Sequence, residues 1–240
     1  MSKIAFRLKP MFVLVIICAT GLTGFGYLMQ QRAASRLPNV HITSGVTKPN
    51  LAMELVRSRQ DVVEVLLKPG TPESNARRVA MREIQCMDLP FIACYVCLFC
   101  ITGLQMTAMP GSFKRALGYS VIVLIIAAGL FDVLEDWSIV WVSRLDAAQL
   151  APGFTRTFAL CKWSLIFVTL ILVSAWLFTW PRRDLLHWLP AVIAAACLLV
   201  CGLLGIVGVV ASDKVIQMAS TFSAVAIGGL LVPLLLMYVY

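Results

Sequence analysis

Six long apolar stretches restrict what this chain can fold into. They cover residues 10–29, 87–108, 116–142, 157–180, 186–211 and 215–238. Each is close to or above the roughly 20 residues with which an α-helix crosses the hydrocarbon core of a bilayer. Only 13% of the residues are charged, about half the share in soluble domains, so a fold in water could not cover its apolar surface. The sequence therefore predicts an integral membrane protein.

The predicted fold class is all-α, a bundle of six transmembrane helices. Lipid offers no hydrogen bonds to a bare backbone, so a spanning segment of this length has to satisfy its own backbone groups as a helix. Short connections between the later stretches predict that successive helices are antiparallel neighbours. We divide the chain into a first span (1–29), a loop with two amphipathic helices (30–86) and a five-helix bundle (87–240).

The basic residues predict the orientation of the bundle. If the amino terminus is cytoplasmic, most lysines and arginines next to the spans fall on the cytoplasmic side, as the positive-inside rule requires. Both termini are then cytoplasmic and the loop 30–86 lies outside. The net charge of +8 follows from topology, so no nucleic-acid partner is expected. The cytoplasmic residues are Lys3, Arg7, Lys9, Lys114, Arg115, Arg182 and Arg183, against Arg144, Arg156 and Lys214 outside.

Within the loop, start and stop signals predict two helices. Asn50 can cap a first helix that ends near Leu67. Thr71 followed by Pro72 is a typical helix start, with a capping side chain and a proline in the first turn. No helix breaker follows before Pro90. The second helix is therefore expected to continue directly into the second span.

An apolar stripe on the first of these helices allows two interpretations. In the simpler one, the stripe packs on the second helix or on the outer ends of the spans. In the other, it forms a surface that binds lipid, a partner protein or a hydrophobic substrate. The residues predicted for that surface are Leu51, Leu55, Val62 and Leu66.

Charged side chains inside the spans are informative, because each costs several kcal/mol to place in lipid and has to be compensated or used. Asp132, Glu135 and Asp136 follow one another at helical spacing, so their side chains share one face of the third span. Lys162 in the fourth span is expected at the same depth as Glu135 and Asp136. We therefore expect Lys162 to pair with one of these two acids.

Asp132 lies deeper and needs a different partner. We expect it to be protonated or to contact a polar group such as Tyr95, Ser138 or a bound cation. Asp88 opens the second span from the same side, and Tyr95 follows two helical turns later on the same face. A structural role for these charges, in fixing how the spans assemble, is the simplest interpretation.

This pattern resembles small bacterial multi-span membrane proteins. The segments that carry the resemblance are M-D-L-P-F-I-A-C-Y at residues 87–95 and F-D-V-L-E-D at residues 131–136, within a similar region of about 50–142. Those proteins have D-x-x-E-N in the second segment, and Asp136 stands in place of the asparagine. The resemblance implies only a set of residues that act together, and no activity, and we expect the chain to lie in a bacterial inner membrane. These residues are Asp88, Tyr95, Asp132 and Glu135.

Cysteines recur at three-residue spacing in the second span, at Cys94, Cys97 and Cys100. Steps of three drift around a helix, so these sulfurs cannot converge on one ion without help from another helix, such as that of Cys197 and Cys201. Packing of small apolar residues is the simpler interpretation. The two histidines are far apart in the sequence. No metal site and no cofactor are expected.

Three functions remain open. The leading hypothesis is a non-enzymatic accessory or assembly subunit that binds a partner protein or lipid through its outer half. The second is a small cation- or proton-coupled transporter with Asp132 and Glu135 as ion-binding acids and Lys162 as their counter-charge. An enzyme acting on lipid is the weakest, because the common catalytic motifs are absent. The expected partners are membrane lipids, with another membrane protein or a second copy of the chain as alternatives.

Overall fold

The computed structural model describes residues 2–37, 40, 42, 44–144, 152–179 and 185–239. These ranges contain eight α-helices and no strand. Six of the helices are long and apolar enough to cross a membrane. The predicted all-α, six-helix class is thereby confirmed. The six are α1 (Ser2–Arg36), α4 (Pro72–Ala108), α5 (Ser112–Val142), α6 (Pro152–Phe178), α7 (Leu185–Ala211) and α8 (Asp213–Val239).

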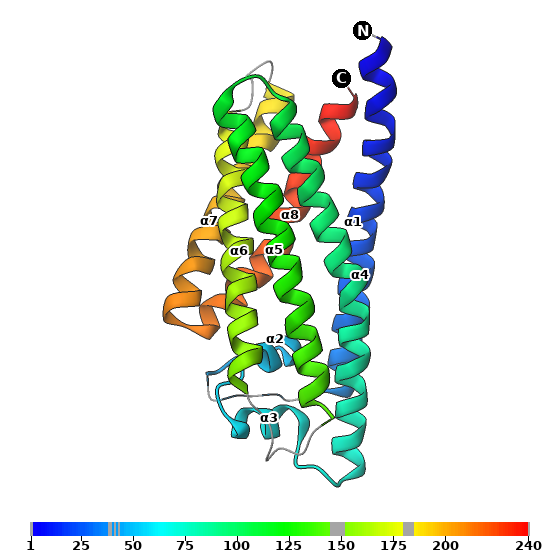
Figure 1. The fold of residues 1–240 in the computed structure, drawn as a ribbon, viewed down its shortest axis with the longest axis vertical. Coiled ribbons are helices and arrows are strands. Elements are labelled where there is room, and N and C mark those ends of the chain that lie inside the picture. Colours follow the sequence, from blue (N-terminus) through cyan, green and yellow to red (C-terminus); the bar gives the residue numbers. More distant parts are fainter. Residues whose placement is uncertain are drawn as a thin grey trace.

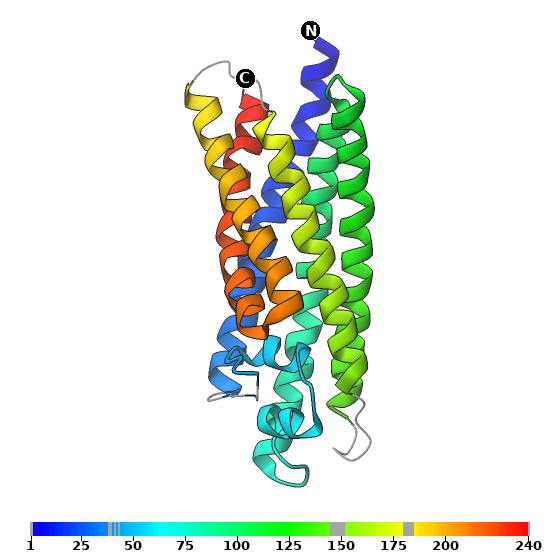
Figure 2. The same cartoon turned by 90° about the vertical axis from the view of Figure 1, so that its left-hand side faces the viewer.

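The six long helices form a ring in which each packs on the next along the chain (Figures 1 and 2). Helix α1 packs on α4, and the order then continues through α5, α6 and α7 to α8, which also contacts α1. Buried apolar residues from all six helices fill the centre of the ring as one core. Helix α1 begins and α8 ends at the same end of the bundle, which we call the terminal end (Figure 1).

Two glycines bring α4 and α5 close together. A Cβ atom on Gly118 of α5 would lie 2.5 Å from the carbonyl oxygen of Gly103 in α4. A Cβ atom on Gly103 would meet the Gly118 carbonyl oxygen at 2.8 Å. Small residues allow such backbone approach between membrane helices, where packing rather than the hydrophobic effect holds helices together. This contact fixes the pair of helices that carries most of the acidic residues described below.

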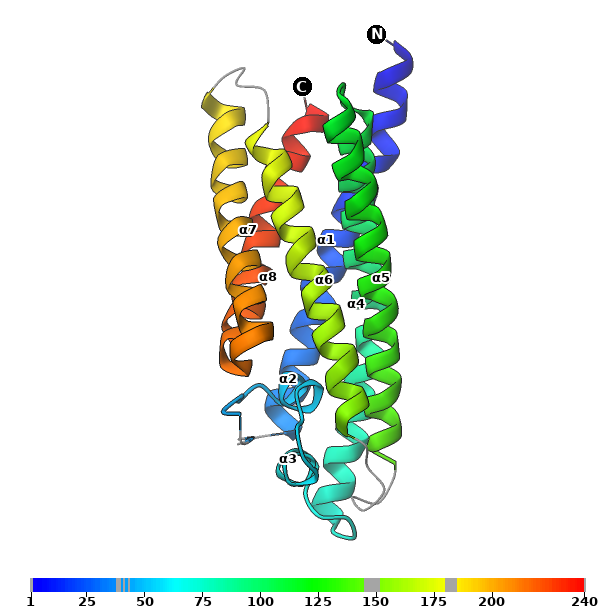
Figure 3. The same cartoon turned by 60° about the vertical axis from the view of Figure 1, so that its left-hand side comes forward.

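The described residues between 40 and 71 form a cap over the other end of the bundle, which we call the capped end (Figure 3). The cap contains two short helices, α2 (Pro49–Glu54) and α3 (Arg59–Leu66). Its apolar side chains form a second core with Ile139 of α5, Ala159 of α6 and Ile216 of α8. The cap thus lies on the ends of the spanning helices.

The prediction of one helix from Asn50 to about Leu67 is wrong. Helix α2 follows the cap residue Lys48 and ends at Glu54, and a new helix starts after Ser58. The Ser58 hydroxyl accepts a hydrogen bond from the Asp61 backbone N–H, and the Asp61 carboxylate accepts one from the Ser58 backbone N–H. This reciprocal capping box supplies a helix start inside the expected helix.

The predicted start of the next helix is confirmed. The Thr71 hydroxyl accepts a hydrogen bond from the Ser74 backbone N–H at 3.1 Å, and Pro72 occupies the first turn. Helix α4 then continues without interruption through Pro90 to Ala108. Part of α4 therefore projects beyond the cap before the helix enters the bundle (Figure 1).

The apolar stripe of the cap does not form a surface. Its four residues are at most 4% exposed and belong to the core between the cap and the ends of the spans. Their prediction as a lipid- or partner-binding surface is wrong, because the cap folds over the bundle and removes the stripe from contact with any other molecule. The simpler interpretation, packing on the spans, is confirmed. The residues are Leu51, Leu55, Val62 and Leu66.

Ion pairs fasten the cap and the neighbouring helices at the capped end. Arg156 of α6 donates to both carboxylate oxygens of Asp213 in α8, at 3.0 and 2.9 Å, and to the Leu55 carbonyl oxygen of the cap at 3.0 Å. Arg57 of the cap adds a 3.0 Å ion pair to Asp213, whose side chain is 2% exposed. A fully buried carboxylate is tolerated here because two arginines neutralise it.

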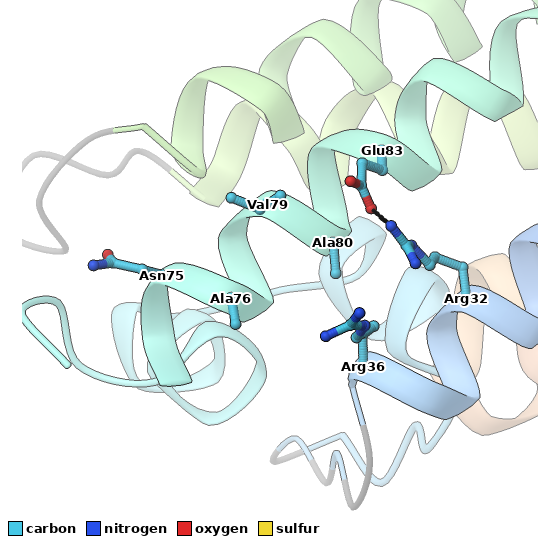
Figure 4. A pocket seen from close by; sticks show the side chains of 7 residues that line it. All are labelled: Arg32, Arg36, Asn75, Ala76, Val79, Ala80 and Glu83. Atoms are coloured by element: carbon cyan, nitrogen blue, oxygen red, sulfur yellow. Dashed lines mark hydrogen bonds and ion pairs between the residues drawn. The ribbon is translucent and has the colours of Figure 1, made fainter. Parts of the chain in front are cut away.

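A shallow pocket of about 290 Å³ lies between α1 and α4 at this end (Figure 4). Arg32 of α1 forms an ion pair with Glu83 of α4 beside it, with Nε 2.7 Å from the carboxylate, and Arg36 lies on the same side. The exposed ion pair between Arg32 and Glu83 links the two helices beside this pocket. Arg182 and Arg183, on which the predicted orientation partly depends, lie outside the described residues.

Candidate functional site

Five carboxylates and one lysine gather where the cap meets α4, α5 and α6. One carboxylate comes from α2, one from α4 and three from α5, and the lysine comes from α6. We call this group the acidic cluster. Its members are Glu54, Asp88, Asp132, Glu135, Asp136 and Lys162.

Lys162 is the cation of the acidic cluster and has three partners. Its ammonium nitrogen Nζ lies 2.8 Å from Asp132 Oδ1, 2.6 Å from Glu135 Oε2 and 3.1 Å from Glu54 Oε2. The lysine side chain is only 4% exposed. The predicted pairing with Glu135 is confirmed. Asp136 does not pair with the lysine, and Asp132, for which we expected a different partner, does.

Helix geometry explains why α5 supplies three acids to one place. Residues at i, i+3 and i+4 share one face of a helix, and here that face points into the bundle. Asp132, Glu135 and Asp136 are accordingly all buried, at 4%, 1% and 5% exposure. Because lipid would penalise each of these charges, the face has to turn toward the protein interior.

Glu54 is the functional residue that the sequence analysis missed. It is the last residue of α2, and its carboxylate also accepts a 2.9 Å hydrogen bond from the indole N–H of Trp163. Trp163 is the neighbour of Lys162 in α6, and its ring lies 5.2 Å from the ammonium group. The sequence signal was that Glu54 is the single acid within the apolar run of residues 51–56. An exposed helix face would carry more polar residues, so this pattern indicates a buried acid.

Tyr95 joins α4 to this network. Its hydroxyl donates a 2.9 Å hydrogen bond to Asp132 Oδ2, so both oxygens of Asp132 have partners. Gly129, one helical turn before Asp132, leaves room for α4, because a Cβ atom there would lie 2.7 Å from Val96. The predicted contact with Tyr95 is confirmed. The Ser138 alternative is wrong, since that hydroxyl donates to the Glu135 carbonyl oxygen.

Asp88 and Asp136 differ from the other acids because no positive side chain pairs with them among the described residues. One carboxylate oxygen from each of Asp88, Asp132 and Asp136 lies within 4.8 Å of the other two. Asp136 Oδ2 is buried and receives no hydrogen bond from a described donor, and the Asp136 carboxyl group lies within hydrogen-bonding reach of the Asp88 carboxyl group. Asp88 is partly exposed and connects this group to the surface.

The charges of the acidic cluster do not balance. If all five acids were ionised, Lys162 would leave four negative charges uncompensated in a largely buried site. Two like charges 4 Å apart repel by about 4 kcal/mol at the effective dielectric constant of a protein boundary. The surplus must therefore be carried by bound protons or by a bound cation. The arrangement can bind either.

An apolar layer separates the acidic cluster from the terminal end. Apolar side chains of the bundle core in this direction are at most 1% exposed. Thr102, a buried polar residue of α4 in this direction, donates to the carbonyl oxygen of its own helix at Leu98. Within the described residues, Glu54 and Asp88 are the partly exposed members of the cluster. The layer includes Leu98, Phe99, Val121, Ile125 and Phe167.

The cysteines of α4 meet α1 instead of α7. Cys18 of α1 lies within hydrogen-bonding reach of Cys97 and close to Cys94. The proposed contribution of Cys197 and Cys201 is wrong, since α7 packs on α6 and α8. All eight cysteines are free thiols. Among the described residues, the only group with metal-ligand spacing is that of the three aspartates.

No protein-family model matches this chain, and comparisons with curated proteins and with solved structures find no match either. The acidic cluster itself is therefore the basis for a functional argument.

Proposed function

We propose that this multi-pass membrane protein is a small cation- or proton-coupled transporter in which the acidic cluster binds the coupling ion. One observation carries the proposal: three buried and two partly buried carboxylates gather around a single lysine, which pairs with three of them. Intramembrane acids are costly, and they commonly mark ion or proton pathways when they face a bundle interior. A purely structural network would need only as many acids as its cation can neutralise.

Access from one side supports the same function. Asp88 is partly exposed, whereas buried apolar side chains fill the bundle core toward the terminal end. A coupled transporter opens its binding site to one side of the membrane at a time. We infer that the cluster opens through Asp88 toward the outside of a bacterial inner membrane, with the cap outside and both termini in the cytoplasm.

The surface that suggested an accessory subunit is not exposed in the structure. Its partner-binding residues are buried between the cap and the ends of the spans. The lipid-enzyme hypothesis gains no support, because the acidic cluster places Lys162 against three carboxylates rather than beside a nucleophile. Transport therefore remains the function that best accounts for the surplus of acids.

Reconstitution in liposomes that contain a pH-sensitive dye tests this function. We expect the wild-type chain to change the internal pH when a gradient of protons or of a metal cation is imposed. Asp132→Asn should abolish this signal, because it removes the charge that contacts both Lys162 and the two unpaired acids. Glu64→Gln is the matched control, since Glu64 lies exposed on the cap. Absence of any ion-dependent signal from the correctly folded wild type would overturn the proposal.

A further inference from the structure

The acidic cluster divides into two parts with different chemistry. Lys162 neutralises Glu54, Asp132 and Glu135 through direct ion pairs. Asp88 and Asp136 receive no such contact from the described residues, although they lie beside Asp132. The second part therefore holds the surplus of negative charge.

The three aspartates have the spacing of ligands around one ion. Their nearest oxygens all lie within 4.8 Å of one another. Two ligands on opposite sides of an ion at about 2.4 Å are separated by about twice that distance, so a single Ca²⁺ fits this spacing. The three aspartates belong to two neighbouring helices, α4 and α5, and glycines allow these helices to pack closely. The ligands are therefore carried on a rigid pair of helices.

An unsatisfied oxygen points independently to a ligand. Asp136 is 95% buried, its Oδ2 atom receives no hydrogen bond from a described donor, and its carboxyl group lies within hydrogen-bonding reach of the Asp88 carboxyl group. Buried carboxylate oxygens in folded proteins normally have a donor or a cation as partner, because an unpaired one loses its interactions with water without replacement. The ligand that satisfies Asp136 Oδ2 has to be positively charged or to donate a proton.

Donor chemistry selects the class of ion. Three carboxylates offer only oxygen, which suits hard cations such as Ca²⁺, Mg²⁺ and Mn²⁺ and not ions that prefer sulfur or imidazole. Water molecules entering beside the partly exposed Asp88 can complete the coordination shell. The positive charge of Lys162, which contacts Asp132, repels such an ion. The ion is therefore expected closer to Asp88 and Asp136 than to the lysine.

We propose that Asp88, Asp132 and Asp136 bind one hard divalent cation. The role of this cation as the coupling ion rests on the proposed function. The binding of the cation does not depend on that function. The two oxygens of Asp132 already contact Lys162 and Tyr95, so Asp132 is a ligand shared between the ion and the lysine. Asp88 and Asp136 supply the remaining protein ligands.

Binding of Mn²⁺ to the purified full-length chain tests the site. The free Mn²⁺ concentration, measured by electron paramagnetic resonance, should reveal one bound ion per chain, and Ca²⁺ or Mg²⁺ should displace it. Asp136→Asn and Asp88→Asn should each weaken binding by about tenfold or more, because each removes one ligand charge. Glu64→Gln should bind as the wild type does. Size-exclusion chromatography confirms that each variant is folded.

Two results would overturn the metal site. One is Mn²⁺ binding that Asp136→Asn leaves unchanged. The other is a wild type that binds no Mn²⁺ and shows an infrared band of a protonated carboxyl group that Asp136→Asn removes, since the ligand would then be a proton. Mn²⁺ binding without transport would keep this site and refute the transport function. Proton transport without Mn²⁺ binding would keep the function and refute this site.

Discussion

Replacement of Lys162 by methionine is the most informative perturbation of the acidic cluster. Methionine has a similar length but no charge, so the packing volume is largely kept while the positive charge is lost. Lys162 contacts three carboxylates at 2.6 to 3.1 Å and is 4% exposed. The substitution therefore leaves Glu54, Asp132 and Glu135 buried without their counter-charge.

The expected destabilisation follows from this burial. Removing one partner of a buried ion pair costs about 3–5 kcal/mol, because the remaining charge has neither water nor a partner. The three contacts share one ammonium group, so their contributions do not add. For a chain of this size, each kcal/mol shifts the unfolding temperature by about 2–4 °C. Lys162→Met should thus lower that temperature by roughly 6–20 °C.

Reaction of buried thiols with a fluorescent maleimide during heating provides the assay. Cys18 and Cys201 are 3% and 4% exposed and should become reactive when the bundle unfolds. Lys68→Met is the control, because Lys68 is exposed in the cap and should change the unfolding temperature by no more than about 2 °C. Glu54→Gln combined with Lys162→Met should restore part of the loss, since one uncompensated charge is removed. An unfolding temperature of Lys162→Met equal to that of the wild type would refute the reasoning.

Three further substitutions test other contacts of the bundle by the same thermal assay. Tyr95→Phe removes the hydrogen bond to the buried Asp132 and should cost about 1.5–3 kcal/mol, and a stability equal to the wild type would contradict the contact. Gly118→Ala should cost about 1–3 kcal/mol by pushing α4 from α5, whereas Gly24→Ala, with open space at its Cβ position, should be nearly neutral. Arg156→Ala should cost about 1.5–3 kcal/mol, because Asp213 is buried but keeps its ion pair with Arg57, and a loss below about 1 kcal/mol would mean that the Arg156 pair is solvated.

Local sequence patterns predicted the elements of this fold well. The spans follow from the length of the apolar stretches alone, because a bilayer demands about 20 apolar residues per helix. The start of α4 follows from Thr71 and Pro72, whose side chains act on their own helix end. The common face of the three acids in α5 follows from helix periodicity. All these features depend on residues that are close together in the sequence.

Contacts between distant residues were the part that the sequence did not reveal. The Glu54 and Lys162 side chains are separated by 108 residues and meet only because the cap folds over the ends of α5 and α6. The break between α2 and α3 was a different failure, since the Ser58–Asp61 capping box is a local signal that the apolar pattern on both sides concealed. The break also explains the burial of the stripe, because a single straight helix could not follow the surface of the bundle in the same way.

The division of the acidic cluster makes its two roles experimentally separable. Glu135 contacts Lys162 and lies outside the group of three aspartates, so Glu135→Gln should act mainly on the attachment of the lysine and hence on stability. Asp136 belongs to that group and does not touch the lysine, so Asp136→Asn should act mainly on ion binding. Asp132 belongs to both groups. If stability and Mn²⁺ affinity change together in Asp132→Asn but separately in the other two variants, one carboxylate couples the structural ion pairs to the ion site.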